Sequence, residues 1–359
     1  MGMNPLACYI YRDGTDFILP PAMDIQPRRT LEAPEGLVGI IDDGTEAGLR
    51  VPIPEYFFPT TPDEAAVFLF PYELGSLLNL LPPEKCAAFL ESLPYFRGRE
   101  RRHVFSDLGD KATIIPLPVW LLKRSLLTSA GEPCPASPFF YRRPEADFPF
   151  CIPLPYRLPD HNRLEKPKFN HPHLKYDCSF VGGFSHPIRN IACAAVAREP
   201  ELRFFNGGFK SIEIHENGFF TTKEFTPEEN ARRQALFRRV TRESLMVLCP
   251  PGVGPQSYRF YETLYHGRIP ILFTRKIRYP LEHLIDYERF CFFIGENELL
   301  ETGVIIKRIL REHPLDALWE RCILACKTWN TYFAGNSFYA HVLPLLMAAL
   351  SSQGVPSEL

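Results

Sequence analysis

The amino-acid sequence predicts an α/β protein of two domains, and three features lead to this prediction. The segment 245–273 contains a strand, a Gly/Pro loop, a helix and a second strand in one compact unit. Strands and helices alternate regularly from Tyr176 onward. The length of 359 residues exceeds what one core normally needs and suffices for two.

The compact unit begins with the apolar run 245–249, which has the length of a strand. The loop PPGVGPQ follows, and its prolines and glycines exclude a helix. Ser257 is a favoured N-cap residue, so we expect a helix to start there and to end at Gly267. The run 269–273 is then a second strand.

A strand, a glycine loop and a helix N-terminus together predict an anion site, because loop and first-turn N–H groups point outward at the positive end of the helix dipole. Arg259 can pair with phosphate oxygens. Glu262, three residues later on the same helical face, can accept hydrogen bonds from a vicinal diol. The two side chains suggest a nucleotide, although a solvated Arg–Glu pair explains the spacing equally well.

The run CPPGVGPQSYRFYETLYHGRIPIL resembles the C-terminal signature of the exostosin family, glycosyltransferase family 47. This resemblance implies a GT-B fold, with two Rossmann-like halves facing a cleft and the sugar-nucleotide donor bound mainly by the C-terminal half. It also implies an inverting transfer of a hexose or pentose from a nucleotide sugar, in the first instance a UDP-sugar, to a hydroxyl of a glycan acceptor. The donor-binding residues that it implies are Arg189, Gly252, Gly254, Ser257, Tyr258, Arg259 and Glu262.

Composition excludes several other classes of protein. With 40 basic and 42 acidic residues the net charge is -2, which gives no electrostatic reason to propose a nucleic-acid partner. The 10 cysteines include several within apolar runs and no CxxC pair, which favours reduced core residues over a disulfide framework. Cys322 and Cys326 are four apart on an expected helix, but they lack the further ligands of a metal site.

The predicted N-terminal domain spans residues 1–165 and lies on the acceptor side of the fold. Its expected strands are 7–11, 65–71 and 148–156, with a helix at 82–93. The segment FRGRERRHVFSDLGD resembles a family stretch that places His103 before a strand and Asp107 on the loop side after it. These two are the candidate catalytic bases, and a core-capping role is the main alternative for His103.

The predicted C-terminal domain spans residues 166–335, and the polar stretch 159–173 is the predicted interdomain linker at its start. In the linker, His171 and His173 have no third candidate metal ligand nearby, so we expect them to be solvated. Within the domain, YDCSFVGG is a strand, HPIRNIACAAVARE a helix and LRFFNGG a second strand.

Arg189 falls in the first turn of that helix, so we expect it to meet Arg259 over one diphosphate. A dehydrogenase would place G-x-G-x-x-G at this turn, and GGFSHP does not match it.

Thr226 and Glu229 form a capping box with Pro227 at the first helical position, so a helix runs to about Arg242. Leu236, Phe237 and Val240 are expected to face inward. Four arginines are interpreted as the solvated face of this helix: Arg232, Arg233, Arg238 and Arg239.

The residues 336–359 are expected to form a crossover helix and tail that return to the N-terminal domain, as in GT-B folds. Their apolar part, 336–350, contains Pro344 and is too short to span a bilayer. The opening MGMNPLACYIYRDG has neither a basic region nor a sustained apolar region, so we expect a soluble or cytoplasmic protein.

The sequence contains no D-x-D pair, so we expect the donor and the glycan acceptor to be used without a divalent metal or another cofactor. Two alternatives stay open: a catalytically silent exostosin-like partner in a homo- or heterodimer, and a nucleotide-binding α/β protein of another kind.

Overall fold

The computed structural model of the chain describes residues 6–11, 16, 37–40, 49–52, 57–73, 82–107, 120–123, 126–127, 151–153, 174–210, 212–214, 220–222, 225–252, 256–273, 277–334, 337–338 and 340–342. All structural statements below concern these residues. The predicted linker with His171 and His173, and Gly254 of the glycine loop, lie outside them.

The N-terminal part contains a parallel six-stranded sheet. In spatial order its strands are β4 (Phe57–Pro59), β1 (Leu6–Ile10), β5 (Val67–Glu73), β6 (His103–Asp107), β7 (Trp120–Lys123) and β9 (Cys151–Pro153). Helix α3 (Pro83–Glu91) and the short 3₁₀ turn η1 (Glu100–Arg102) connect β5 to β6. The strands predicted at 7–11 and 65–71 and the helix predicted at 82–93 are confirmed. The strand predicted at 148–156 is described over β9.

The C-terminal part contains a parallel five-stranded sheet. In spatial order its strands are β11 (Phe204–Phe209), β10 (Tyr176–Gly183), β14 (Ser244–Cys249), β15 (Ile269–Leu272) and β17 (Phe292–Phe293). The strands and helices predicted between residues 176 and 273 are therefore confirmed, with small shifts at their ends.

Helices cover both faces of the C-terminal sheet, because successive strand side chains alternate between the faces. On one face, Phe180 and Met246 pack with α4 (Pro187–Ala197) and α7 (Thr302–Glu312), which follows the 3₁₀ turn η5 (Glu296–Glu301). On the other face, Val181 packs against α5 (Pro227–Arg242) and Val247 lies with α6 (Tyr258–Tyr265). Helix α8 (Leu315–Thr328) packs beside α6 and continues into the π-helical turn η6 (Trp329–Phe333).

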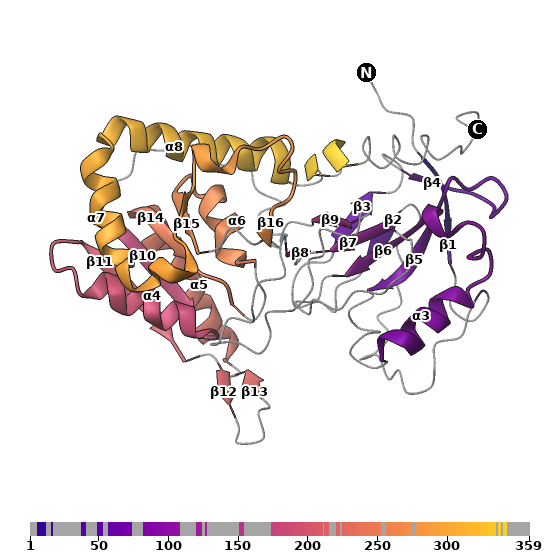
Figure 1. The fold of residues 1–359 in the computed structure, drawn as a ribbon, viewed down its shortest axis with the longest axis horizontal. Helices are drawn as coiled ribbons and strands as arrows, with labels where there is room; N and C mark the ends of the chain where they lie inside the picture. Colours follow the sequence, from indigo (N-terminus) through magenta and orange to yellow (C-terminus); the bar gives the residue numbers. More distant parts are fainter. Residues whose placement is uncertain are drawn as a thin grey trace.

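The two sheets share one topology: the first strand in the chain lies between the second and the third. Where the order reverses, helices leave in opposite directions and open a crevice at the carboxyl ends of the strands. In the C-terminal sheet this crevice lies between β10 and β14. Two parallel sheets with this strand order confirm the predicted GT-B fold class, and they lie in the two lobes of the chain (Figure 1).

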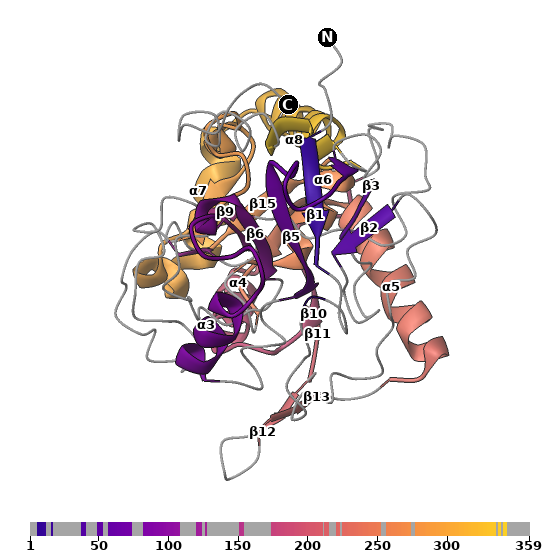
Figure 2. The same ribbon diagram turned by 90° about the vertical axis from the view of Figure 1, so that its right-hand side faces the viewer.

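Smaller elements join or extend these lobes. Strand β8 (Leu126–Leu127) of the N-terminal part pairs antiparallel with β16 (Ile277–Arg278) of the C-terminal part, near the 3₁₀ turn η4 (Tyr287–Arg289). Strands β2 (Leu37–Ile40) and β3 (Leu49–Pro52) form one antiparallel pair. Strands β12 (Ile212–Ile214) and β13 (Phe220–Thr222) form another, which projects away from both sheets (Figures 1 and 2).

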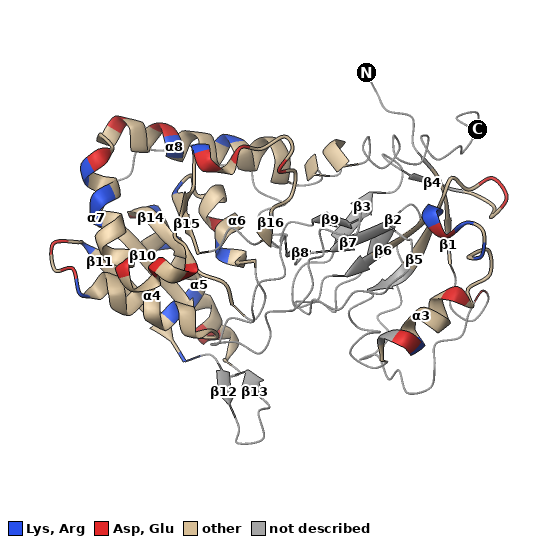
Figure 3. Cartoon of the chain, in the orientation of Figure 1, with Lys and Arg blue, Asp and Glu red and all other residues tan. Residues whose placement is uncertain are grey.

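The C-terminal crossover is supported by Phe338 and Val342, which are buried in a cluster that also contains Cys8, Val67 and Val104 of the N-terminal sheet. The helical segment that carries them lies between the end of α8 and the N-terminal lobe (Figure 1). The described outer helices α7 and α8 carry charges of both signs (Figure 3), in keeping with the small net charge.

Candidate functional site

Strand β14 and helix α6, on either side of the glycine loop, have the predicted form. Every residue of β14 is buried, and α6 starts directly after Ser257. The helix ends at Tyr265, and Gly267 lies just past its C-cap, with a φ of 60° in the left-handed region that favours glycine. Ser257 occupies the N-cap position with extended backbone, but its side chain makes no capping hydrogen bond. Its buried Oγ has no hydrogen-bond partner among the described residues.

Arg259, in the first turn of α6, reaches across to strand β10. Its Nε donates to the carbonyl oxygen of Val181 at 2.8 Å, and its Cζ lies 4.7 Å from the centroid of the Phe180 ring. This position requires a glycine in the strand, because a Cβ on Gly182 would lie 1.8 Å from Nη2 of Arg259. Its two terminal nitrogens have no acceptor among the described residues, so they are available to a ligand.

Arg189, in the first turn of α4, lies at the same strand end. Its Nη1 donates to the carbonyl oxygen of Gly183 at 2.5 Å, and its Nε donates to that of Pro251 at 2.9 Å. A Cβ on Gly252 would come within 2.5 Å of Arg189 Nη2, so the glycine makes room for the guanidinium.

The two arginines are anchored two residues apart on β10, which is about 6.6 Å along a strand. Their anchors, Val181 and Gly183, follow the last β10–β14 pair, Ser179 with Val247. The structure therefore brings Arg189 and Arg259 together at the crevice between β10 and β14, where ligands bind in such sheets.

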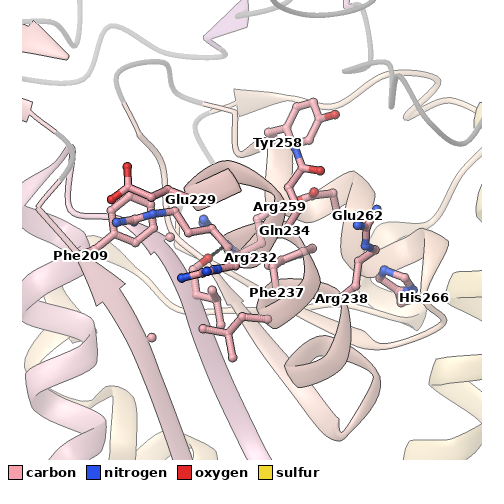
Figure 4. Close-up of a pocket in the computed structure, with 15 residues that line it drawn as sticks. Phe209, Glu229, Arg232, Gln234, Phe237, Arg238, Tyr258, Arg259, Glu262 and His266 are labelled. Atoms are coloured by element: carbon pink, nitrogen blue, oxygen red, sulfur yellow. Dashed lines mark hydrogen bonds between the residues drawn. The ribbon is translucent and has the colours of Figure 1, made fainter. Parts of the chain in front are cut away.

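A cavity of about 530 Å³ opens beside Arg259, between α5 and α6 and above the ends of β10 and β11. Figure 4 shows Phe209 and Glu229 at one end of it, and Glu262 and His266 at the other. Its lining residues all come from the C-terminal part: Val181, Gly182, Gly207, Phe209, Glu229, Arg232, Arg233, Gln234, Leu236, Phe237, Arg238, Tyr258, Arg259, Glu262 and His266.

Glu262 is half-buried in this cavity, and its carboxylate accepts no hydrogen bond from another described residue. Burial raises its pKa to about 7, although the nearby charges of Arg259 and Arg238 act in the opposite direction. A carboxylate that is partly desolvated and lacks a protein donor is well suited to accept hydrogen bonds from hydroxyl groups of a ligand.

Three arginines that belong to the cavity were missed from the sequence. Arg232, Arg233 and Arg238 line it. Arg233 and Arg238 are half-buried, so the interpretation as a solvated face is wrong for these two, whereas Arg232 and Arg239 are exposed as expected. The capping box from Thr226 to Glu229 and the inward positions of Phe237 and Val240 are confirmed. The signal was present: positions 229, 232, 233, 236 and 237 follow helical spacing and extend the apolar stripe toward the carboxyl ends of the strands.

His103 does not fit the role of candidate base. Its side chain is 0% exposed, with Nε2 2.7 Å from the Tyr11 hydroxyl and Nδ1 2.8 Å from the Arg99 carbonyl oxygen. Burial lowers its pKa to about 4. It is also the first residue of β6, at the amino end of the sheet, whereas ligands bind at the carboxyl ends. The alternative role in the core is what the structure supports.

Asp107 is the last residue of the same strand, and its backbone lies opposite that of Lys123 in the parallel pair of β6 and β7. It thus lies about 13 Å from His103 along the strand, at the carboxyl end. Its position agrees with an acceptor-side role, and that role stays a prediction.

Cysteines of the described part are reduced and buried, as expected. Cys322 and Cys326 lie in α8, where burial raises the pKa of both thiols, which disfavours the thiolates that bind metals. Among the described residues, no group of three or more metal-ligating side chains occurs. Likewise, the described helices include none with the length and hydropathy to cross a bilayer.

A family profile described as the Exostosin GT47 domain matches residues 165–312, which contain the crevice, both arginines and the whole cavity. The resemblance seen in the run from Cys249 is therefore confirmed over the entire C-terminal sheet.

Two curated relatives come from Arabidopsis thaliana. One named probable glycosyltransferase is 24% identical over 271 residues, which is 70% of this chain and 50% of the relative. Another, named probable arabinosyltransferase ARAD1, is 28% identical over 89 residues, 25% of this chain and 20% of the relative. The chain thus spans about half the length of the first relative and less of the second.

Solved glycosyltransferase-type structures show a weak overall likeness. TarM aligns with 9% identity and a TM-score of 0.38, over 73% of this chain and 58% of its own. Anabaena HepE, crystallised with UDP-glucose, aligns with 12% identity and a TM-score of 0.39, over 81% of this chain and 92% of its own. Likeness at this level supports no statement about ligands.

Proposed function

We propose that the protein is a glycosyltransferase that uses a nucleotide-diphosphate sugar, in the first instance a UDP-sugar, and transfers a hexose or pentose to a hydroxyl of a glycan. The observation that carries this proposal is the pair formed by Arg259 and Glu262. Within one cavity, a guanidinium with unused terminal N–H groups stands one helical turn from a carboxylate without a protein donor. These are the groups that a diphosphate and a ribose diol require.

The transfer that we propose proceeds with inversion. The acceptor hydroxyl oxygen forms a bond to the anomeric carbon while the bond from that carbon to the diphosphate oxygen breaks. The electron pair of the broken bond goes to the diphosphate, and the proton of the hydroxyl goes to a base on the opposite side of the sugar. Arg189 and Arg259 would stabilise the leaving diphosphate, together with the N–H groups at the start of α6.

Asp107 is the residue that we propose as the base, because it ends a strand at the carboxyl edge of the N-terminal sheet. Asp107→Asn should lower kcat about 10²- to 10⁴-fold and leave the affinity for UDP unchanged. Near-normal turnover of this variant with donor and acceptor present would exclude Asp107 as the base.

The direct test of the proposal is calorimetric titration of UDP, followed by a screen of UDP-, GDP- and dTDP-sugars for hydrolysis and transfer. UDP should bind, and Glu262→Ala should weaken it about tenfold to a hundredfold, since a hydrogen bond to a charged group contributes about 1.5–3 kcal/mol. Glu243→Ala is the matched control, because Glu243 follows α5 and pairs with Lys175 away from the cavity.

The screen also separates the alternatives. A silent partner subunit would bind UDP without turning over any donor, alone or with a second chain. A nucleotide-binding protein of another kind would bind NAD in preference to UDP. Unchanged UDP affinity in Glu262→Ala would reject the assignment of the ribose to Glu262.

A further inference from the structure

Arg233 is held in the cavity in an unusual way. Its Cζ lies 3.9 Å from the centroid of the Phe209 ring and 3.8 Å from that of the Phe225 ring. The planes of these two rings meet at 87°, so the guanidinium sits in an aromatic corner. The rings fix its position through cation–π attraction and use none of its N–H donors.

These donors have no acceptor among the described residues. Arg268 is different, because it is buried and donates to the backbone carbonyl oxygens of Arg242 and Gly267. Arg233 is half-buried, lines the cavity and has five N–H donors. A fixed, partly desolvated guanidinium of this kind is prepared for an acceptor supplied by a ligand.

The other charged groups at the site indicate which part of the ligand meets Arg233, and this step rests on the proposed function. Arg259 and Arg189 lie at the crevice for the diphosphate, and Glu262 takes the ribose. The nucleobase is the part of the nucleotide that these groups leave unassigned. Leu236 and Phe237 of α5 give the cavity apolar walls that suit a flat ring.

We propose that Arg233 reads the base and selects nucleotides with a carbonyl oxygen at the edge where others carry an amino group. Uracil and thymine have this oxygen at position 4 and guanine has it at position 6, whereas cytosine and adenine have an amino group there. A guanidinium can only donate, so an amino group at this edge leaves two donors facing each other without an acceptor. Sites built around a hydrogen bond reject ligands that lack it far more strongly than apolar pockets do.

The test compares five nucleoside diphosphates by calorimetry: UDP, dTDP and GDP against CDP and ADP. The native chain should bind the best carbonyl-edged ligand at least about tenfold more tightly than either amino-edged one. Arg233→Met keeps the length and helix propensity of the side chain but removes its donors. It should lose about tenfold to a hundredfold for carbonyl-edged ligands and change less than about threefold for CDP and ADP.

Two further variants separate base reading from general attraction of phosphate. Arg233→Lys keeps the charge and should still lose most of the preference, because the planar fork is absent. Arg239→Met removes an exposed arginine of α5 that does not line the cavity, and it should behave as the native chain does. Circular dichroism would show that each variant is folded.

An equal loss for all five ligands in Arg233→Met would place Arg233 on the phosphates and overturn the proposal. Absence of a carbonyl preference in the native chain would do the same, while the effect of Glu262→Ala on UDP would still support the proposed function. If the native chain binds none of the five, the proposed function fails and the inference fails with it.

Discussion

His103 in the N-terminal sheet and Glu262 in the C-terminal part are both ionisable side chains with shifted pKa values, but their surroundings differ. The nitrogens of His103 both have partners and the ring is closed off by aromatic neighbours. Glu262 lies against a cavity and has no donor among the described residues. A shifted pKa thus arises in two ways in this molecule. That of His103 comes from a fully hydrogen-bonded core position at the amino end of one sheet, and that of Glu262 from a cavity without a donor near the carboxyl end of the other.

The largest expected effect would come from the two arginines beside Glu262. Arg189→Ala with Arg259→Ala should lower kcat at least about a hundredfold, because charge on the leaving diphosphate grows as the glycosidic bond breaks. The affinity for UDP should fall less than kcat. Steady-state kinetics and calorimetry on the same variant measure both quantities.

Arg203→Ala is the control for this pair, because Arg203 binds Asp177 near the amino end of β10, away from the crevice. Full activity in the double variant would remove the diphosphate role from both arginines.

Next in size is the pH dependence at Glu262. With a pKa of about 7 in the free protein, the carboxylate must lose its proton to hold a diol. The affinity for UDP should therefore fall about tenfold from pH 8 to pH 6 through this group. The affinity of Glu262→Gln for UDP, measured over the same pH range, shows the part of the change that comes from protonation of the UDP phosphate. An identical pH slope in both proteins would contradict the prediction.

The same group affects the stability of the free protein. Between its unfolded value near 4.5 and about 7, Glu262 binds a proton in the folded chain that the unfolded chain has lost. The free energy of unfolding should therefore fall as the pH rises from about 4.5 to about 7, and this loss is complete above pH 7. Glu262→Gln should show less of this loss in thermal melts at pH 5 and pH 8.

His103 should behave in the opposite manner. His103→Ala should lower the free energy of unfolding by about 2–4 kcal/mol through lost core contacts, and leave the affinity for UDP unchanged. In the native chain the unfolded state takes up a proton at His103 near pH 6.5, while the folded state does so only near 4. The histidine therefore lowers stability as the pH falls from 6.5 toward 4, which denaturant titrations at several pH values would measure. A loss of UDP binding in folded His103→Ala would break the contrast with Glu262.

The smallest expected effect is that of chelation. If Arg189 and Arg259 supply the positive charge for the leaving group, EDTA should leave the transfer rate unchanged. Loss of activity in EDTA with recovery on adding manganese would show that an ion shares this role, and it would weaken the assignment to the arginines.

The sequence by itself determined the local elements of the C-terminal sheet and the four residues from Arg259 to Glu262. These depend on short-range physics: strand-length apolar runs, a capping box at Thr226, a glycine after α6, and helical spacing that puts two side chains on one face. The family resemblance added Arg189, whose meeting with Arg259 depends on strand order.

Tertiary structure decided what each charge contacts. Arg233 of α5 and Arg259 of α6 are both helix arginines, yet Arg233 meets the rings of Phe209 and Phe225, and Arg259 meets a carbonyl of β10. His103 and Asp107 lie four residues apart in one strand but at opposite edges of the sheet, and strand direction sets which edge faces ligand. Burial and the supply of hydrogen-bond partners come from residues far apart in the chain, so helical spacing and local motifs do not contain them.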